Sequence, residues 1–563
     1  MKSLVYIVIG ALSLTFPTVS QGVASELDVV VPTASCASLT GTDMAAIGGE
    51  GSTISAAEET TSNGIAVCSV TGTLAPEINF QVLLPMESWT QRYLQVGCGG
   101  LCGNITLTSG ASTGCQVLND GGFVMAATDM GHSGNDGTWG LDAQKRIDFA
   151  HRAQQLTADA AKALIAAFYG QPPKYSYFNG CSDGGREALM MAMRSPDAFD
   201  GVIAGAPAML FQVQNTLFHG WMAASNYDDA GEVILTSAKL PALHAAVVAA
   251  CDETDGVKDG LIAEPARCEF DPHSISCPAD APETDQCLTA AQVDVVRKFY
   301  AGPQDQTTGA YLTAGQPLYG SELNWQGVYV ADDADSELFS QMIVDPVLKY
   351  LAFDPARPDM ELEDLEFTED TLNALRVRHP LFDATNPDLS DFQQAGGKLI
   401  LWHGMADPHI SPANTLALHV GMEAAMGAEI RDRFERLYLL PGVSHCSGGE
   451  GPSHLDLLTP MISWVEDGAA PDAIMTATAG ETSSFGQPDG VTDSKGGRQA
   501  MDLGVTPLPD MERPVYPYPH VASWSGQGDV TKAAGWTKGP AAEIVRLRDW
   551  PGMDLFTPYD FAD

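Results

Sequence analysis

The segment Gly180-Cys181-Ser182-Asp183-Gly184 constrains the fold of this chain more than any other. It follows a strand-like run at residues 175–179 and precedes a helix-like run at residues 185–193. A serine flanked by glycines between a strand and a helix is typical of a nucleophile elbow, a turn too tight for side chains beside the serine. The sequence therefore predicts that Ser182 projects at a strand end, next to a helix N-terminus that favours developing negative charge.

The N-terminus has the pattern of a secretory signal peptide. Residues 1–25 begin with Met1-Lys2-Ser3, run apolar from Leu4 to about Phe16 and end in small residues. The alternative, a membrane anchor, would need a longer apolar stretch, and no later segment is long and apolar enough to cross a bilayer. We therefore expect a secreted or periplasmic protein without stable membrane insertion.

The composition is strongly acidic. Asp and Glu number 72 against 29 Lys and Arg, which gives a formal net charge of −43. Such a surface repels nucleic acid and anionic membranes, so neither is expected as a partner. A solubility adaptation explains the charge most simply, and an acidic functional patch is the alternative. The sequence leaves the oligomeric state open.

Strand-like and helix-like runs alternate on both sides of the elbow. Strands are expected at residues 66–74 and 78–85, as an antiparallel hairpin, and at 92–96, 122–127, 201–205, 398–404 and 436–442. A long helical pattern covers residues 146–169. Apolar strands alternating with helices indicate a mostly parallel sheet, so we expect an α/β-hydrolase fold.

The middle of the chain has a different texture. Residues 208–396 are helical, rich in loops and punctuated by proline, and they contain four cysteines. Because strand-like runs flank this block, we interpret it as a lid inserted between two strands of the sheet. The expected domains are a catalytic domain formed by residues 26–207 and 397–563, and a lid formed by residues 208–396.

A base and an acid that could activate Ser182 follow later strands. A serine hydroxyl needs a base, usually a histidine whose tautomer is fixed by an acid, and in this fold the chain order is serine, acid, histidine. Asp407 follows the strand at 398–404, and His445 follows the strand at 436–442. Both should project from the sheet edge that carries Ser182. Asp197 and Asp200 are rivals to Asp407, but they lie one strand too early.

Acyl transfer also needs hydrogen-bond donors for the oxyanion. One donor is expected to be the backbone N–H of Asp183, directly after the serine. The second is expected in the glycine-rich loop after the strand at 92–96, from Gly99 or Gly100, where glycine lets the backbone approach the substrate closely. The sequence does not choose between these two glycines, and an ordinary glycine-rich turn is the alternative.

Two cysteines flank the proposed nucleophile and base. Cys181 directly precedes Ser182, and Cys446 directly follows His445. A disulfide between them would hold Ser182 and His445 in register, and export would permit it. The alternative is two buried free thiols. The chain has 11 cysteines, so at least one lacks an intramolecular partner.

These motifs resemble the tannase and feruloyl esterase family of α/β-hydrolases. The resemblance is carried by Gly180 to Arg186, by His403-Gly404-Met405-Ala406-Asp407-Pro408 and by His445-Cys446, and it extends over residues 36–529. It implies a triad of Ser182, Asp407 and His445, together with a disulfide between the neighbouring cysteines. One departure is that no cysteine follows Cys446, so a C-terminal disulfide common in the family is absent.

The resemblance also implies a structural calcium ion in the lid. Calcium takes six to eight oxygen ligands from carboxylates and backbone carbonyls. The expected ligands are the carboxylates of Asp252, Asp255 and Asp259 and the carbonyls of Val257 and Leu261. The alternative is an acidic turn in an acidic protein.

The remaining cysteines are expected to pair within the lid and the N-terminal region. The expected disulfides are Cys251 with Cys268, Cys277 with Cys287 and Cys36 with Cys68. One of Cys98, Cys102 and Cys115 is then spare, and Cys102 with Cys115 is the favoured pair among the three possible ones.

The function that the resemblance implies is a secreted serine carboxylesterase working through an acyl-enzyme. Its substrates would be small esters of aromatic acids: a gallate, a hydroxycinnamate such as ferulate, or a terephthalate-like monoester. An esterase for aliphatic or acetyl esters, or a catalytically inactive calcium-dependent binding module, are the alternatives. Arg376 and Arg378 are candidates for binding a substrate carboxylate, or else solvated helix charges.

Overall fold

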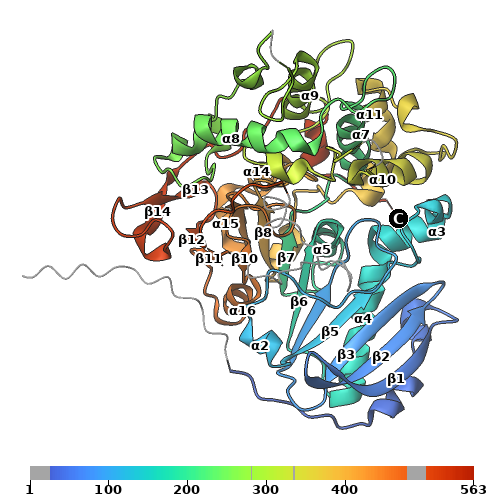
Figure 1. Cartoon of the computed structure of the whole chain (residues 1–563). Helices are drawn as coiled ribbons and strands as arrows, with labels where there is room; N and C mark the ends of the chain where they lie inside the picture. The colour runs from blue at the N-terminus through green and yellow to red at the C-terminus, as the bar shows by residue number, and fades with distance from the viewer. Residues whose placement is uncertain (1–25, 280–281, 334–335, 479–502, 563) are drawn as a thin grey trace, which may run out of the picture.

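The computed structural model describes residues 26–279, 282–333, 336–478 and 503–562 (Figure 1). The expected signal peptide, residues 1–25, lies outside these ranges. Among the described residues, no helix is long and apolar enough to cross a membrane.

A nine-stranded sheet with the order β1-β2-β3-β5-β4-β6-β7-β8-β9 forms the centre of the molecule. Its strands are β1 (Thr53–Ser62), β2 (Ile65–Leu74), β3 (Ile78–Pro85), β4 (Arg92–Val96), β5 (Phe123–Thr128), β6 (Tyr175–Cys181), β7 (Gly201–Gly205), β8 (Lys398–Gly404) and β9 (Glu435–Leu440). Neighbours are antiparallel from β1 to β5 and parallel from β5 to β9. The mostly parallel sheet and the β2–β3 hairpin are therefore confirmed, whereas the edge strand β1 was not predicted.

Helices cover both faces of the sheet. On one face lie α4 (Ala153–Tyr169) and α5 (Asp183–Arg194), which contact strands β5 to β7. On the other lies α16 (Leu458–Asp467), which contacts β7 and β8. Strand β7 serves both layers, because Val202 packs in the core with α4 and α5 while Ile203 packs in the core with α16. The site therefore rests on a three-layer scaffold with two hydrophobic cores.

The helix expected over residues 146–169 is interrupted. A short helix, α3 (Ala143–Ile147), leads into a π-helical turn at Asp148–Arg152, and α4 follows. A π-helical turn shifts the backbone hydrogen-bond pattern and frees carbonyl groups for other partners. Here the carbonyls of Phe149 and Ala150 accept hydrogen bonds from the guanidinium of Arg186, at 3.2 and 3.0 Å.

The segment between β7 and β8 is mainly helical and has a hydrophobic core of its own, running from Phe218 to Val330. Its helices are α6 (Phe211–Val213), α7 (His219–Ala224), α8 (Leu240–Cys251), α9 (Ala290–Ala301), α10 (Phe339–Pro346), α11 (Glu369–Leu375), α12 (His379–Phe382) and α13 (Ser390–Gln394). Figure 1 shows α7 to α11 gathered beyond one end of the central strands. We call this segment the lid below.

The remaining elements lie around the sheet. The other helices are α1 (Ala45–Gly48), α2 (Gln116–Asn119), α14 (Pro412–Met426) and α15 (Ala428–Phe434). A three-stranded sheet contains β10 (His454–Leu455), β11 (Ile474–Ala477) and β12 (Glu512–Val515), and a two-stranded sheet contains β13 (His520–Trp524) and β14 (Trp536–Ala541). These C-terminal strands were not predicted from the sequence.

Candidate active site

Ser182 occupies the turn between β6 and α5 in a strained backbone conformation, with φ of 62° and ψ of −125°. Residues other than glycine rarely adopt positive φ, and such strain is typical of functional sites. A Cβ atom at Gly180 would lie 2.2 Å from the carbonyl oxygen of Gly184, and one at Gly184 would lie 2.9 Å from the carbonyl oxygen of Cys98. Both positions therefore require glycine, which is the physical reason for the sequence pattern.

His445 and Asp407 meet at the same edge of the sheet as Ser182. Nδ1 of His445 lies 2.7 Å from Oδ2 of Asp407, and the His445 side chain is only 13% exposed. Asp407 follows β8, His445 follows β9 and Ser182 follows β6, and these strands belong to the parallel half of the sheet. The three sequence-predicted groups thus lie at the carboxyl ends of neighbouring parallel strands.

The carboxylate of Asp407 is fully buried and fully hydrogen-bonded. Oδ1 accepts the backbone N–H groups of His409 and Ile410 at 2.8 and 3.0 Å, and Oδ2 also lies 3.1 Å from Nε2 of His403. Burial alone would raise the pKa of Asp407, but the charge of His445 and the hydrogen bonds from His403 and His445 outweigh it and lower that pKa. Asp407 therefore stays ionised beside His445.

The rival carboxylates lie at the opposite edge of the sheet. Asp200 directly precedes β7, and its Oδ2 accepts the N–H of Ser176 near the start of β6 at 2.7 Å. Asp197 is exposed three positions earlier. Because parallel strands place their starts and their ends at different edges, neither carboxylate is positioned to contact His445.

Cys181 and Cys446 form a disulfide, with their Cα atoms 6.0 Å apart. Since Ser182 and His445 are the chain neighbours of these cysteines, the bridge ties the elbow to the loop after β9. Three other expected disulfides are also confirmed: Cys36–Cys68, Cys251–Cys268 and Cys277–Cys287.

The expected disulfide between Cys102 and Cys115 is wrong. Cys102 pairs with Cys98, four positions earlier, and Cys115 is a buried free thiol. The N–H of Cys102 donates to the carbonyl of Gly99 at 3.0 Å, and this tight turn brings the two sulfur atoms together. Burial, and then the charge of Asp456, raise the pKa of Cys115 to about 11, so this thiol stays protonated.

The glycine-rich loop after β4 packs directly against the first turn of α5. A Cβ atom at Gly97 would lie 2.5 Å from the Cα of Gly184. Asp183 is the first residue of α5, so its N–H is among the donors that a helix N-terminus leaves without an intrahelical partner. Gly99 and Gly100, the two expected oxyanion glycines, lie in this loop inside the turn closed by the Cys98–Cys102 disulfide.

The lid and the loop after β8 contribute rings beside His445 that the sequence analysis missed. The ring of His409 lies 4.8 Å from that of His445 and 4.4 Å from that of Phe339, in α10 of the lid. His219, in α7, is 6.2 Å from His409. Burial, and then the charge of His445, lower the pKa of His219 to about 3 and lower the pKa of His409 well below its usual value, so both imidazoles are neutral. The position of His409, two residues after Asp407, was the available signal.

The two lid arginines considered for a substrate carboxylate are engaged elsewhere. Arg376 forms an ion pair with Asp554 at 2.7 Å and donates to the carbonyl of Pro551. Arg378 donates to the carbonyl of Phe353 at 3.0 Å and lies 3.6 Å from Asp354.

The acidic segment at residues 252–261 offers oxygen atoms suited to a hard cation. One oxygen of Asp252 and one of Asp255 accept backbone N–H groups, whereas among the described residues the second oxygen of each has no hydrogen-bond donor. Burial first, and then the charge of Asp259, raise the pKa of Asp255 to about 6. Asp259 instead pairs with Arg513 at 2.7 Å, and the three carboxylates do not each bring an oxygen within 4.8 Å of the others. The oxygen atoms of this segment are of the type that calcium binds, and the raised pKa of Asp255 indicates that its negative charge is poorly compensated. Asp259 is already paired with Arg513.

Comparison with known proteins gives consistent matches over most of the chain. The family model for tannase and feruloyl esterase matches residues 62–538. Mono(2-hydroxyethyl) terephthalate hydrolase from Piscinibacter sakaiensis is 30% identical over 540 residues, which span 83% of this chain and 84% of that protein. The probable feruloyl esterase B-2 of Aspergillus flavus is 31% identical over 424 residues, covering 70% of this chain and 76% of that protein.

The solved structures agree on the fold. The crystal structure of feruloyl esterase B from Aspergillus oryzae superimposes with a TM-score of 0.74 at 24% identity, covering 90% of this chain and 100% of that one. The tannin acyl hydrolase of Aspergillus niger superimposes with a TM-score of 0.62 at 23% identity, covering 87% and 90%. The α/β-hydrolase fold expected from the sequence is therefore confirmed.

Proposed function

The chain belongs to the tannase and feruloyl esterase family of carboxylic ester hydrolases. On that premise we propose that Ser182, His445 and Asp407 are the catalytic triad of an enzyme that hydrolyses esters of aromatic acids. The observation that carries the proposal is the 2.7 Å contact between His445 and Asp407, at the sheet edge where the Cys181–Cys446 disulfide holds the elbow. An aromatic ester hydrolase requires this triad to be active, whereas an inactive binding module does not. Membership of a family of ester hydrolases favours the first hypothesis.

The proposed reaction proceeds through an acyl-enzyme. In the neutral form of His445 the single ring proton is held on Nδ1 by ionised Asp407, so Nε2 can accept the proton of Ser182. The Ser182 oxygen attacks the ester carbonyl, and the tetrahedral intermediate collapses as His445 returns the proton to the departing alcohol. A water molecule, deprotonated by His445, then attacks the acyl-enzyme and releases the acid, which restores Ser182.

Two backbone N–H groups are proposed to stabilise the oxyanion. One belongs to Asp183 at the start of α5, and the other to Gly99 or Gly100 in the loop after β4. Donors fixed where negative charge develops lower the barrier because they need no reorganisation during the reaction. The close packing of Gly97 against Gly184 supports this assignment, since it puts the two backbone segments in contact.

The neutral rings beside His445 support an aromatic acid as the acyl group. His409 and Phe339 offer flat, uncharged surfaces from the loop after β8 and from the lid, and aromatic rings pack favourably on such surfaces. Relatives named as a feruloyl esterase and as a terephthalate monoester hydrolase suggest a hydroxycinnamate or a terephthalate monoester, and tannase relatives suggest a gallate.

A hydrolysis panel tests this proposal. Methyl ferulate, methyl gallate, mono(2-hydroxyethyl) terephthalate and p-nitrophenyl acetate should be compared at equal concentration, with Ser182→Ala as the control. We expect at least one aromatic ester to have a higher kcat/KM than p-nitrophenyl acetate and Ser182→Ala to be inactive. A preference for the acetate would favour the aliphatic esterase, and absence of both hydrolysis and fluorophosphonate labelling would favour the binding module.

We further propose that the lid binds a structural calcium ion. The carboxylates of Asp252 and Asp255 with the carbonyls of Val257 and Leu261 would hold the ion, and Asp259 would join them on releasing its ion pair with Arg513. The ion would neutralise buried negative charge and stabilise this part of the lid.

We also propose that the protein is exported. Five disulfides among the described residues favour an oxidising compartment. N-terminal sequencing of the mature protein tests export, because cleavage near residue 25 is expected.

A further inference from the structure

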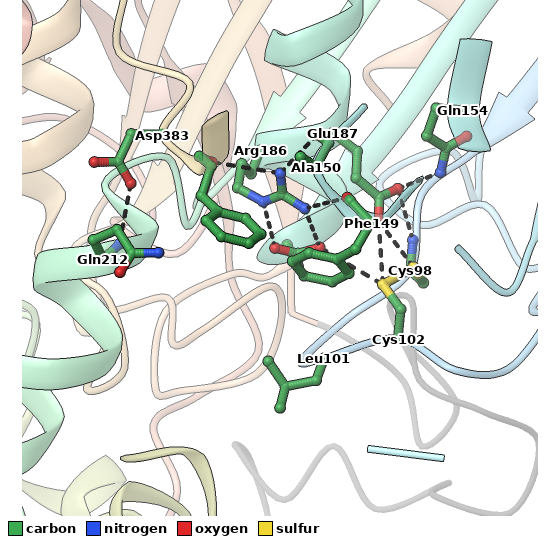
Figure 2. A network of polar contacts seen from close by, with 12 residues as sticks. Cys98, Leu101, Cys102, Phe149, Ala150, Gln154, Arg186, Glu187, Gln212 and Asp383 are labelled. Atoms are coloured by element: carbon green, nitrogen blue, oxygen red, sulfur yellow. Dashed lines mark hydrogen bonds and ion pairs between the residues drawn. A yellow bond between two sulfur atoms is a disulfide. The ribbon is translucent and has the colours of Figure 1, made fainter. Parts of the chain in front are cut away.

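A carboxyl group is buried beneath the glycine-rich loop after β4. Glu187 lies one turn after Asp183 in α5 and is 1% exposed. Figure 2 shows its side chain reaching across to Cys98, Cys102 and Gln154. The proposed triad chemistry makes no use of this group, so its burial needs a separate explanation.

The contacts of Glu187 assign a proton to one of its oxygens. Oε2 accepts hydrogen bonds from Nε2 of Gln154 at 2.5 Å and from the N–H of Cys98 at 3.3 Å. Oε1 lies 2.9 Å from Sγ of Cys98 and 3.2 Å from Sγ of Cys102. The sulfur atoms of a disulfide carry no hydrogen, so these two short contacts are hydrogen bonds only when Oε1 carries the proton.

The charges around Glu187 favour the same neutral form. Burial, and then the negative charge of Asp183, raise the pKa of Glu187 well above its usual range. The nearby cation, Arg186, is engaged by Asp183 through two hydrogen bonds of 2.6 and 2.9 Å and packs against the ring of Phe149. Glu187 therefore acts as a neutral hydrogen-bonding group.

The loop above Glu187 is held at its ends by backbone hydrogen bonds and in its middle by side chains. The N–H of Gly97 donates to the carbonyl of Asn179 at 3.1 Å, and Gly103 donates to Asp129 and accepts from Gly134, both at 3.2 Å. A Cβ atom at Gly97 would lie 2.8 Å from Oε2 of Glu187, so the loop backbone rests directly on this carboxyl. The carbonyl of Leu101 accepts a hydrogen bond from Nε2 of His132 at 2.7 Å. The disulfide closes the turn across Gly99 and Gly100 and presents both of its sulfur atoms to Glu187.

We infer that Glu187 and the Cys98–Cys102 disulfide are positioning groups that fix the loop of one oxyanion donor against the helix of the other. Glu187 lies within α5, one turn after Asp183, and its side chain contacts the loop at Cys98, directly before the two candidate glycines. The inference rests on the proposed function, because the spacing of the two donors matters only if an oxyanion forms between them.

Kinetics of two substitutions at Glu187 test the inference. We expect Glu187→Ala to lower kcat by about tenfold or more with KM nearly unchanged, a smaller loss than the about 10²–10³-fold caused by removing an oxyanion donor. Glu187→Gln should restore kcat to near the wild-type value, because a neutral amide offers one acceptor and one donor in the same places. Wild-type kcat in Glu187→Ala, or equal losses in both variants, would overturn the inference.

A matched control separates positioning from stability. Glu435 is also a buried glutamate, 2% exposed, but it pairs with His419 at the other end of β9. Glu435→Ala should lower Tm without lowering kcat. If it lowers kcat as much as Glu187→Ala does, the effect reflects general destabilisation and the positioning role is rejected.

A disulfide variant covers the case in which Glu187→Ala does not fold. The double variant Cys98→Ala/Cys102→Ala should also lower kcat while KM stays close to wild type, and unchanged kcat would overturn the inference. All assays use an ester that the wild-type protein hydrolyses and Ser182→Ala does not. Absence of wild-type hydrolysis would reject the proposed function and this inference together, whereas an active wild type with unaffected variants rejects this inference alone.

Discussion

Nε2 of His244 lies 2.7 Å from Oε2 of Glu450, and this contact joins lid helix α8 to the loop that carries His445. Nδ1 of the same ring lies 2.7 Å from Oε2 of Glu322, also in the lid. Both ring nitrogens therefore face carboxylates, so the ring is a doubly protonated cation. Burial opposes this charge, but the two glutamates outweigh it and raise the pKa of His244 to about 10.

Replacing His244 should change how stability depends on pH. A histidine whose folded pKa of about 10 exceeds its usual value of 6.5 contributes its full stabilisation below pH 6.5 and loses it as pH rises toward 10. We expect His244→Gln to be less stable than wild type near pH 6 and the difference to shrink at higher pH. Thermal unfolding at several pH values measures this, and parallel curves for the two proteins would contradict it.

Asn in place of Asp407 should remove most of the activity. The amide would no longer fix the His445 tautomer or stabilise its protonated form, and the equivalent change in a serine protease triad lowers kcat about 10⁴-fold. We expect a loss of that order in kcat for Asp407→Asn with little change in KM. Asp200→Asn serves as the control, because Asp200 lies at the opposite sheet edge and should retain activity. The reverse ranking of the two variants would refute the assignment of Asp407.

The Cys181–Cys446 disulfide should matter more for catalysis than another disulfide does. Removing a native disulfide typically costs about 2–5 kcal/mol of unfolding free energy. We expect Cys181→Ala/Cys446→Ala to lose kcat in addition, because Ser182 and His445 are no longer held in register. Cys36→Ala/Cys68→Ala is the matched control, since that bridge reaches β2 at the antiparallel end of the sheet. Similar kcat values for both double variants, at a temperature where both are folded, would argue against the special role.

Calcium removal should destabilise the protein if the acidic lid segment binds the ion. A ligand at about 100 times its dissociation constant stabilises the native state by about 2.7 kcal/mol, so a chelator should lower Tm measurably. Because the pKa of Asp255 is raised to about 6, protons compete with calcium below that value, and the chelator effect should be larger at pH 8 than at pH 5. Asp255→Asn should lose the effect, while Asp271→Asn, at an exposed aspartate, should keep it. An unchanged wild-type Tm with chelator at pH 8 would count against the site.

The sequence predicted the parts of the site that follow local rules and missed those set by tertiary contacts. The elbow at Ser182 and the positions of Asp407 and His445 depend on a tight turn and on strand ends, which are visible in the chain order. The pairing of Cys98 with Cys102 depends on a turn at Gly99 that many glycine-rich segments could form. Glu187 reads as an ordinary helix residue because its partners lie 33 and 89 positions away.

The same distinction separates the secondary-structure elements that the sequence predicted from those that it did not. Strands β4 to β9 were predicted from their mostly apolar runs. The clearest is β8 (KLILWHG), where burial on both faces leaves a continuous hydrophobic run in the sequence. Strand β1, with the sequence TISAAEETTS, is half exposed at the sheet edge and lacks that pattern. The π-helical turn at Asp148–Arg152 presents carbonyl acceptors to Arg186, which lies 37 positions after Phe149, so local sequence patterns did not reveal it.

The neutral state of Glu187 makes a prediction about stability that is independent of catalysis. A carboxyl whose folded pKa is raised above its usual value of 4.5 binds a proton in the native state that the unfolded state has released, so folding becomes less favourable as pH rises above 4.5. Glutamine makes equivalent contacts and does not titrate. We expect the Tm of Glu187→Gln minus that of wild type to grow between pH 5 and pH 8, as measured by differential scanning calorimetry under oxidising conditions. A difference that stays constant or falls over this range would show that Glu187 is ionised in the folded protein.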